Sequence, residues 1–332
     1  MVPVIIIILA AGIAVLTFFL LKNIFQQKKK TSASNLKDKN TVLKAMREAK
    51  AAIEKDPQNS DAHYLLGKAY MADKRDEQAF REYKSVSRLG IAGTQIPETE
   101  FRETLASLYT KYHEEEEALK EYLLLIKLHP ENPEYYFLAG RLFSTRNRAD
   151  LAEQYLRKAA SIYPKEVRYR FELGNLYYTS KKLKEASGEF EAILKLDPTN
   201  GLALLNMGKV LKDSKDFSGA LPYLERASRD LEIKLRALVE LGGCYMSLKM
   251  LDKAIQELER AVDIISKEAD LDSLYARYFL AMCYEKTQEF TKAVAQWDKI
   301  YSQKKNFRDV GEKLTQYIEY RAGNEDKDQP RK

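Results

Sequence analysis

Few residues in this chain of 332 residues could do chemistry. There are three histidines, His63, His113 and His129, and two cysteines, Cys244 and Cys283. A metal site needs several His, Cys, Asp or Glu ligands at short spacings, and a nucleophilic cysteine needs a base beside it. None of the histidines has a partner at ligand spacing, and the cysteines do not form a CxxC motif. We therefore expect no metal site, no catalytic residue and no enzymatic activity.

One further cluster, the run of glutamates from Glu114 to Glu117, offers carboxylates that could hold a cation. The other interpretation, which we favour, is that the run opens a helix, because acidic side chains stabilise the positive end of a helix dipole. The chain contains no GxGxxG motif, no Walker loop and no GxSxG motif. We expect no cofactor.

A repeat of small and large residues organises most of the chain. Glycine or alanine recurs every 34 residues, with a step of 39 at either end, at Gly67, Ala106, Gly140, Gly174, Gly208, Gly242 and Ala281. An alanine stands twelve residues after each of them, and a large apolar residue four after that, at Tyr83, Tyr122, Leu156, Phe190, Leu224, Leu258 and Trp297. A fixed period of this length indicates an array of stacked helical hairpins.

The pattern resembles the tetratricopeptide repeat (TPR) over roughly Thr41 to Lys305. An aromatic residue or leucine follows each small residue by three positions, and a closing proline is present at Pro57, Pro130, Pro164 and Pro198. The tryptophan that the family favours early in the first helix is replaced, for example by His63, Tyr136 and Leu204. The resemblance implies an all-α fold, a right-handed α-solenoid of TPR helix-turn-helix units with a concave groove.

The recurring small residues have a packing reason. Two helices approach to about 8 Å only where their facing side chains are small. We expect the large residue that follows to fill the space between repeats, and Trp297 to belong to the core. Cys244 and Cys283 occupy equivalent places in adjacent repeats, too far apart for the ~7 Å limit on the Cα atoms of a disulfide. We interpret both cysteines as packing residues.

Six segments are predicted in chain order. After the repeats, Phe307, Val310, Leu314 and Tyr317 fall at helical spacing with polar residues between them, which predicts a helix that covers the last repeat. The segments are a transmembrane anchor at 1–24, a basic polar tether at 25–40, an N-terminal capping helix or half repeat at 41–59, seven TPR units at 60–305, a C-terminal capping helix at 306–321 and a disordered tail at 322–332.

The first segment is predicted to span a membrane. Val2 through Leu21 is an unbroken apolar run, and about 20 such residues span the hydrocarbon core as a helix. Four lysines follow it, at Lys22, Lys28, Lys29 and Lys30, whereas no basic side chain precedes it. A cleaved signal peptide would carry positive charge before the run. The positive-inside rule then predicts a single-pass protein of the cytoplasmic (inner) membrane with its repeats in the cytoplasm.

The formal net charge of +6 is concentrated in the same segment, because the first 40 residues hold six lysines and one acidic residue. These lysines suit the anionic headgroups of lipids. The repeats are nearly neutral and carry no basic stripe interleaved with aromatic residues. We therefore expect no nucleic-acid partner.

The resemblance also implies which residues line the groove. The first helix of each repeat is expected to place there Phe137, Arg141, Phe171, Asn175, Tyr178, Asn206, Lys209 and Arg236. Some members of the family bind a peptide C-terminal carboxylate with Lys, Asn, Asn, Lys and Arg from three repeats. Asn175, Asn206 and Arg236 match three of these places, but Phe171 and Glu240 stand where two cations would be.

These departures predict a groove for an extended peptide or a partner helix and not for a terminal carboxylate. The alternative is that these side chains are half-buried and bind nothing. The function predicted is that of a membrane-anchored scaffold or adaptor. The alternative function is a regulatory or assembly subunit of a cell-envelope membrane complex that contacts its partner through the transmembrane helix. A degenerate enzyme or lipid-handling protein has no residue in its favour.

Overall fold

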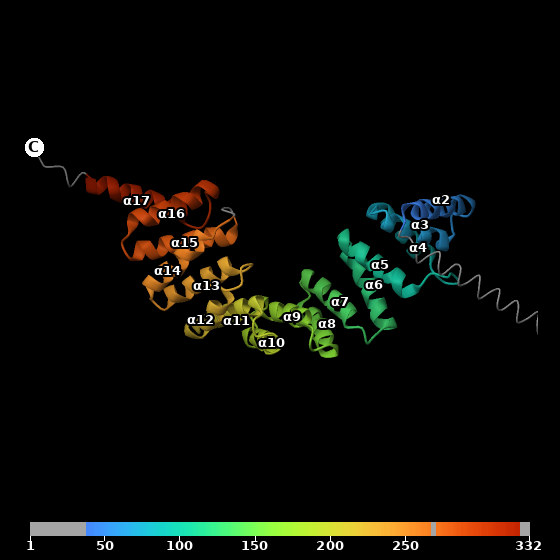
Figure 1. Cartoon of the computed structure of the whole chain (residues 1–332), viewed down its shortest axis with the longest axis horizontal. Helices are drawn as coiled ribbons and strands as arrows, with labels where there is room; N and C mark the ends of the chain where they lie inside the picture. Colours follow the sequence, from blue (N-terminus) through green and yellow to red (C-terminus); the bar gives the residue numbers. More distant parts are fainter. Residues whose placement is uncertain (1–37, 267–269, 326–332) are drawn as a thin grey trace, which may run out of the picture. The chain divides into compact units, whose positions relative to one another are not determined.

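The computed structural model describes residues 38–266 and 270–325, with side chains described up to residue 317. The described residues form sixteen helices and no strand (Figure 1). The chain divides into two compact parts, Met1–Glu131 and Asn132–Lys332, which we call the N-terminal lobe and the C-terminal lobe. An all-α array of helix pairs is therefore confirmed. The right-handed twist of the solenoid stays a prediction.

Each lobe is a series of helices joined by short turns. The N-terminal lobe contains α2 (Lys39–Lys55), α3 (Ser60–Ala72), α4 (Asp76–Leu89), α5 (Glu98–Lys111) and α6 (Glu115–Leu128). The C-terminal lobe contains α7 (Pro133–Thr145), α8 (Ala149–Ile162), α9 (Val167–Thr179), α10 (Leu183–Leu196), α11 (Gly201–Asp213), α12 (Phe217–Ala227), α13 (Lys234–Ser247), α14 (Leu251–Asp263), α15 (Leu271–Lys286), α16 (Phe290–Gln303) and α17 (Val310–Glu325). From α3 to α16 they form seven hairpins, in which the first and second helices are called helix A and helix B.

The ends of the helices follow local sequence. Asn59, Asn132 and Asn200 cap α3, α7 and α11, and each side-chain oxygen accepts a backbone N–H of the first turn. Helix α6 begins at Glu115, so its first turn carries Glu115, Glu116 and Glu117. The glutamate run therefore opens a helix, as the sequence favoured.

The turn from helix A to helix B has the same form in all seven hairpins. Its residue seven positions after the small residue adopts a left-handed conformation, with φ between 57° and 65°, at Lys74, His113, Asn147, Lys181, Lys215, Lys249 and Gln288. At the fourth hairpin the N–H of Lys181 donates to the carbonyl of Tyr178, and the N–H of Lys182 donates to that of Tyr177. These bonds satisfy the last carbonyls of helix A and reverse the chain. None of the seven residues is glycine, and His113 is here a turn residue.

The small residue of helix A lies directly beneath the large apolar residue of helix B in the same hairpin. A Cβ atom built on Gly174 would lie 2.9 Å from a ring carbon of Phe190, and one on Gly242 would lie 2.5 Å from Cγ of Leu258. Phe190 and Leu258 are fully buried. The large residue thus closes the space inside its own hairpin, whereas we expected from the sequence that it fills the space between repeats. Trp297 is buried in the core, as expected.

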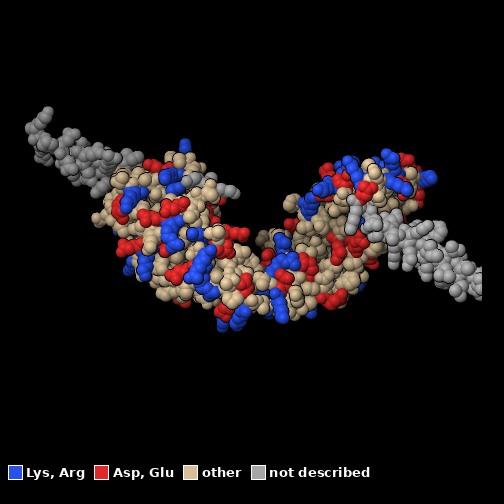
Figure 2. Space-filling model, viewed as in Figure 1, with Lys and Arg blue, Asp and Glu red and all other residues tan. Residues whose placement is uncertain are grey.

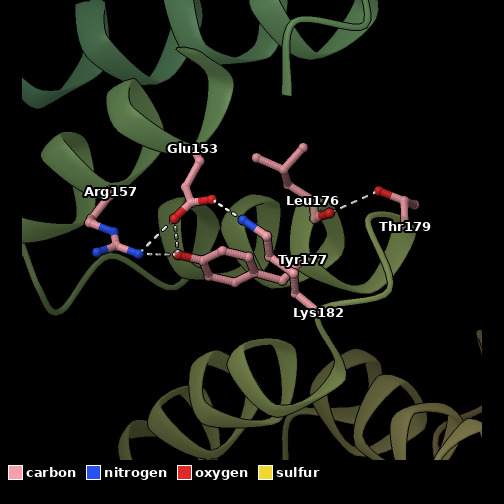
Figure 3. Close-up of polar contacts among 6 residues, drawn as sticks. All are labelled: Glu153, Arg157, Leu176, Tyr177, Thr179 and Lys182. Atoms are coloured by element: carbon pink, nitrogen blue, oxygen red, sulfur yellow. Dashed lines mark hydrogen bonds and ion pairs between the residues drawn. The ribbon is translucent and has the colours of Figure 1, made fainter. Parts of the chain in front are cut away.

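Adjacent repeats in the C-terminal lobe are joined by polar contacts as well as by apolar packing (Figure 3). Glu153 of α8 accepts from Lys182 (2.7 Å) and from Arg157 (2.7 Å), and it also accepts from the hydroxyl of Tyr177 on α9 (3.2 Å). The hydrogen bond from Lys182 lowers the pKa of the Glu153 carboxyl. Tyrosines at the same place in later repeats also reach back, Tyr245 to Glu225 and Tyr284 to Glu259. Where the residue three after the small residue is a tyrosine in this lobe, it therefore links its repeat to the one before.

Both ends of the array are covered by an extra helix. Val42, Ala45, Met46 and Ala49 of α2 pack on the first hairpin, in the place where a capping helix was predicted. After α16, Phe307 and Val310 are buried in the core of the C-terminal lobe with Leu314 packed against it. Helix α17 runs to Glu325, so the first four residues of the segment predicted as a tail are helical.

The predicted anchor (1–24), the tether up to residue 37 and residues 326–332 lie outside the described residues. Within the described ranges, no helix combines the length and the hydropathy needed to cross a bilayer.

The close contact inside a hairpin predicts opposite effects at two neighbouring glycines of α13. Gly242→Ala places a methyl group against Leu258, whereas Gly243→Ala meets nothing within 4 Å. We expect Gly243→Ala to raise the free energy of unfolding by about 0.5–1 kcal/mol, because glycine costs conformational entropy inside a helix. Gly242→Ala should be about 1–3 kcal/mol less stable than Gly243→Ala because the core is overpacked. Urea unfolding followed by circular dichroism measures both, and equal stabilities would contradict the packing described above.

Candidate functional site

The residues with the potential for chemistry are engaged in structural contacts. Nδ1 of His63 lies 2.6 Å from Oε2 of Glu82, and its Nε2 lies 3.1 Å from the carbonyl of Pro57. Nε2 of His129 lies 2.8 Å from the hydroxyl of Thr99. Across the described part of the chain, no group of three or more His, Cys, Asp or Glu residues is placed to hold a metal ion.

A groove is the candidate functional site. It lies in the C-terminal lobe, has a volume of about 540 Å³, and is lined by the A helices α9, α11, α13 and α15 and by one residue that follows α16. Its lining residues are Phe171, Asn175, Leu202, Leu205, Asn206, Lys209, Lys212, Arg236, Val239, Glu240, Leu271, Asp272, Tyr275, Phe279 and Arg308. Five of the eight residues predicted from the sequence are therefore brought together here: Phe171, Asn175, Asn206, Lys209 and Arg236.

The other three predicted residues do not line this groove. Phe137 is only 2% exposed, because its ring packs 5.0 Å from that of Tyr169 and the guanidinium of Arg168 lies 4.8 Å above it. The ring is therefore covered by side chains of the next repeat, and the role of Phe137 in binding a partner stays a prediction. Arg141 is exposed at 3.9 Å from Glu172, and the hydroxyl of Tyr178 donates to Asp213 (2.8 Å).

The part of the groove between α9 and α11 is apolar or uncharged at its floor. Leu205 is buried, and the ring of Phe171 packs against that of Phe190 at 5.9 Å. The Asn206 side chain donates to the carbonyl of Leu202 (2.8 Å). The side chain of Asn175 makes no hydrogen bond within the described ranges. Both amides therefore keep donor or acceptor capacity for a ligand.

The part of the groove between α11 and α15 is charged, and most of its charges are paired. Lys212 donates to Glu240, and Nε of Arg236 lies 3.4 Å from Asp272. Burial raises the pKa of the Asp272 carboxyl, against the attraction of Arg236. Both pairs join neighbouring A helices, so they hold the groove walls together.

Two other cations that line the groove, Lys209 and Arg308, contact aromatic rings. The ammonium group of Lys209 lies 5.3 Å from the centre of the Tyr178 ring, and the guanidinium of Arg308 lies 4.9 Å from that of Tyr275 and 5.0 Å from that of Tyr278. Neither has a carboxylate at ion-pair distance among the residues described. The groove therefore has four cations and two carboxylates, and its excess positive charge comes from these two residues.

The sequence missed the α15 side of the groove. The place of Arg236 recurs 39 residues later at Tyr275, so carrying the repeat frame across the insertion would have found it. Arg308 follows the last repeat, and no periodicity could have placed it in the groove. On the face shown in Figure 2, basic and acidic residues are interspersed over the C-terminal lobe.

Comparison with protein families agrees with this structure. Tetratricopeptide-repeat models match residues 38–88, 116–167, 167–200 and 211–278, which together are more than half of the 332 residues. The chain therefore belongs to the tetratricopeptide-repeat family, as the recurring small residues predicted.

Individual relatives are distant. Anaphase-promoting complex subunit 3 of Schizosaccharomyces pombe is 25% identical over 178 residues, which are 54% of this chain and 27% of that protein. A tetratricopeptide repeat protein from Parabacteroides merdae has a TM-score of 0.54 at 15% identity, covering 82% of this chain and 98% of that chain. The C-terminal part of a TPR protein from Cytophaga hutchinsonii has a TM-score of 0.50 at 17% identity and covers 85% of this chain and 98% of that chain. The two structures show the fold alone.

The cysteines give a prediction about reactivity. Cys244 on α13 and Cys283 on α15 are free and fully buried, and burial raises the pKa of both thiols from the ordinary 9.0 to about 11. The thiolate is the reactive form. At pH 8 we expect a disulfide reagent such as DTNB to leave both unmodified in the folded protein and to label both in urea. Since the fold favours the neutral thiols, their contribution to stability is present below pH 9 and lost as the pH rises from about 9 to 11. Rapid labelling of the folded protein would contradict their role as packing residues.

Proposed function

We propose that this protein is a scaffold or adaptor that holds an extended segment of a protein partner in the groove of its C-terminal lobe. The observation that supports this most directly is the convergence of Phe171, Asn175, Asn206, Lys209 and Arg236 in one hollow of about 540 Å³. Membership of the tetratricopeptide-repeat family, whose members are generally scaffolds, supports the same class of function. The relative from Schizosaccharomyces pombe is itself named as a subunit of a complex.

The chemistry of the groove suits a polypeptide. An extended segment presents backbone amides and side chains in alternation, and each backbone amide needs a polar partner when it leaves water. Asn175 and Asn206 can supply such partners. The apolar surface beside them, at Phe171, Leu202 and Leu205, can cover a side chain of the segment. A partner helix would bury its own backbone bonds and leave these amides unused, so we favour the extended form.

We also propose that residues 1–24 anchor the protein in the cytoplasmic membrane and that the repeats lie on its cytoplasmic side. This proposal is supported by the sequence of Val2 through Leu21 and by the lysines that follow it. Lys22, Lys28, Lys29 and Lys30 would contact anionic headgroups. A partner held in the groove would then be concentrated at the membrane surface. In the alternative, a subunit of an envelope complex, the spanning helix itself contacts the partner.

The groove is tested by a double substitution with a matched control. Phe171→Ala/Asn206→Ala removes one aromatic ring and one amide from the groove, and Tyr163→Ala/Gln154→Ala removes the same groups from exposed positions outside it. Proteins recovered with the full-length tagged chain from solubilised membranes are compared by quantitative mass spectrometry. We expect the groove variant to lose its partner, since losing a central contact of about 2 kcal/mol weakens binding roughly thirtyfold. Equal recovery with both variants would exclude the groove.

The anchor is tested by fractionation. Ile8→Lys/Ile13→Lys places two charges in the apolar run, each costing about 2.5–3.5 kcal/mol at the centre of a spanning helix. We expect the unchanged protein to stay in the membrane after alkaline carbonate extraction and the variant to be released. The repeats should resist protease added to right-side-out vesicles. Cleavage there would reverse the proposed orientation.

The alternative function has its own test. Residues 1–21 are replaced by an unrelated spanning helix, and partner recovery is measured again. A scaffold that acts through the groove keeps its partner after this replacement, whereas a subunit that contacts its partner through the native helix loses it.

A further inference from the structure

Arg308 comes from outside the repeats and is held at one end of the groove by contacts with α15. It lies between α16 and α17, and its φ of 48° is in the left-handed region that side chains other than glycine rarely adopt. Its guanidinium lies over the rings of Tyr275 and Tyr278, and Nη2 donates to the hydroxyl of Tyr275 (3.3 Å). The neighbouring Asp309 is engaged by the hydroxyl of Tyr278 (2.8 Å). The side chain is therefore positioned before any ligand arrives.

The support beneath Arg308 is an aromatic cluster. Tyr275 packs against Phe279 at 5.7 Å and against Phe307 at 5.3 Å, and Tyr278 packs against Phe307 at 6.0 Å. Phe307 is buried, so the residue next to Arg308 fixes the turn in which the arginine lies. An arginine that is already stacked loses less side-chain entropy on binding a carboxylate, because its planar group is oriented in advance.

The end of the groove beside α15 differs from the middle because its cation, Arg308, is not paired with a carboxylate of the described ranges. Lys212 and Arg236 are used by Glu240 and Asp272. Arg308 has further N–H donors beyond the one that it gives to Tyr275, and no carboxylate among the described residues accepts them. At the opposite end, Phe171, Leu202 and Asn206 carry no charge. Lys209 on α11 is the other unpaired cation in the described part of the groove, and its ammonium group lies over the ring of Tyr178. Within the described residues Arg308 is therefore the unpaired cation beside α15, and the apolar residues Phe171, Leu202 and Leu205 lie at α9–α11.

We propose that the groove binds an extended segment in a fixed direction, with an apolar side chain on Phe171, Leu202 and Leu205 and an acidic side chain on Arg308. This rests on the proposed function and names the chemistry of the partner. Three steps from α9 to α15, at about 10 Å per packed helix, span roughly 30 Å. At about 3.3 Å per residue this distance corresponds to roughly nine residues of extended chain.

An internal acidic side chain fits better than a C-terminal carboxylate. A terminal carboxylate needs several cationic or amide donors at one point. Here two of the four cations, Lys212 and Arg236, are bonded to this chain's own carboxylates, and the other two, Lys209 and Arg308, come from different elements. Arg308 alone can offer a fork of two N–H groups to one carboxylate side chain.

The test uses synthetic peptides of nine residues, acetylated and amidated so that neither end is charged. The host carries a leucine and a phenylalanine near one end, serines in the middle, and two adjacent glutamates, glutamines or lysines near the other end, in both sequence directions. Binding to the full-length protein in detergent is measured by fluorescence anisotropy. We expect one direction of the glutamate peptide to bind roughly tenfold more tightly than its glutamine counterpart, as for a charge-assisted hydrogen bond. The lysine peptide should bind least.

Variants assign the preference to one residue. Arg308→Gly removes the guanidinium and suits the left-handed backbone, so the fold and its unfolding temperature should be retained. In this variant, the ratio of the affinities for the glutamate and glutamine peptides should be close to one. Arg229→Gly, which removes an exposed arginine outside the groove, should leave the ratio unchanged. Arg308→Lys keeps the charge but not the fork and should give an intermediate ratio.

Failure of this inference can be told from failure of the proposed function. If Phe171→Ala/Asn206→Ala weakens all peptides equally and Arg308→Gly changes no ratio, the groove binds polypeptide but Arg308 does not select its charge. If no peptide of the set binds, the inference is overturned. The partner-recovery experiment decides the proposed function independently of these outcomes.

Discussion

The contact between the small residue of helix A and the large apolar residue of helix B is the constraint on which the structure depends. It allows the two helices of a hairpin to approach closely, as Gly242 does beneath Leu258. A left-handed residue stands at the same place of the turn in all seven hairpins. A single hairpin leaves the rest of its apolar surface exposed, so it must stack against neighbours to be stable. Stacking in turn aligns the A helices side by side, and their outer surfaces can then form a groove.

Stacking also decides which polar groups remain for a ligand. Tyrosine hydroxyls reach back to carboxylates of the preceding repeat, as from Tyr177 to Glu153, and cations pair with acids on the next A helix, as Lys212 does with Glu240. Each of these surface contacts contributes little to stability. Together they determine which charged side chains are already paired. The charge available for recognition is what stacking leaves over, chiefly Lys209 and Arg308 in the groove.

The proposed function combines two parts of the chain, the apolar run at the N-terminus and the repeats. In this proposal the apolar run at the N-terminus holds the protein at a bilayer, and the stacked repeats hold the partner. A groove with uncharged amides at one end and a stacked arginine at the other favours a segment with an apolar and an acidic residue some distance apart. A scaffold of this kind acts by holding its partner in place, and it needs no chemistry of its own.

The family, the hairpins and most of the core could be predicted from the 34-residue period, because it records contacts between residues close in the chain, such as Gly174 with Phe190. It also found five residues of the groove, all of which lie on the first helix of their repeats. The periodicity did not predict that Arg168 covers Phe137, that Asp272 pairs with Arg236, or that Arg308 completes the groove. These facts depend on side chains from a neighbouring repeat or from beyond the last one. A period specifies where helices pack, but it does not specify which side chain reaches across from the next helix.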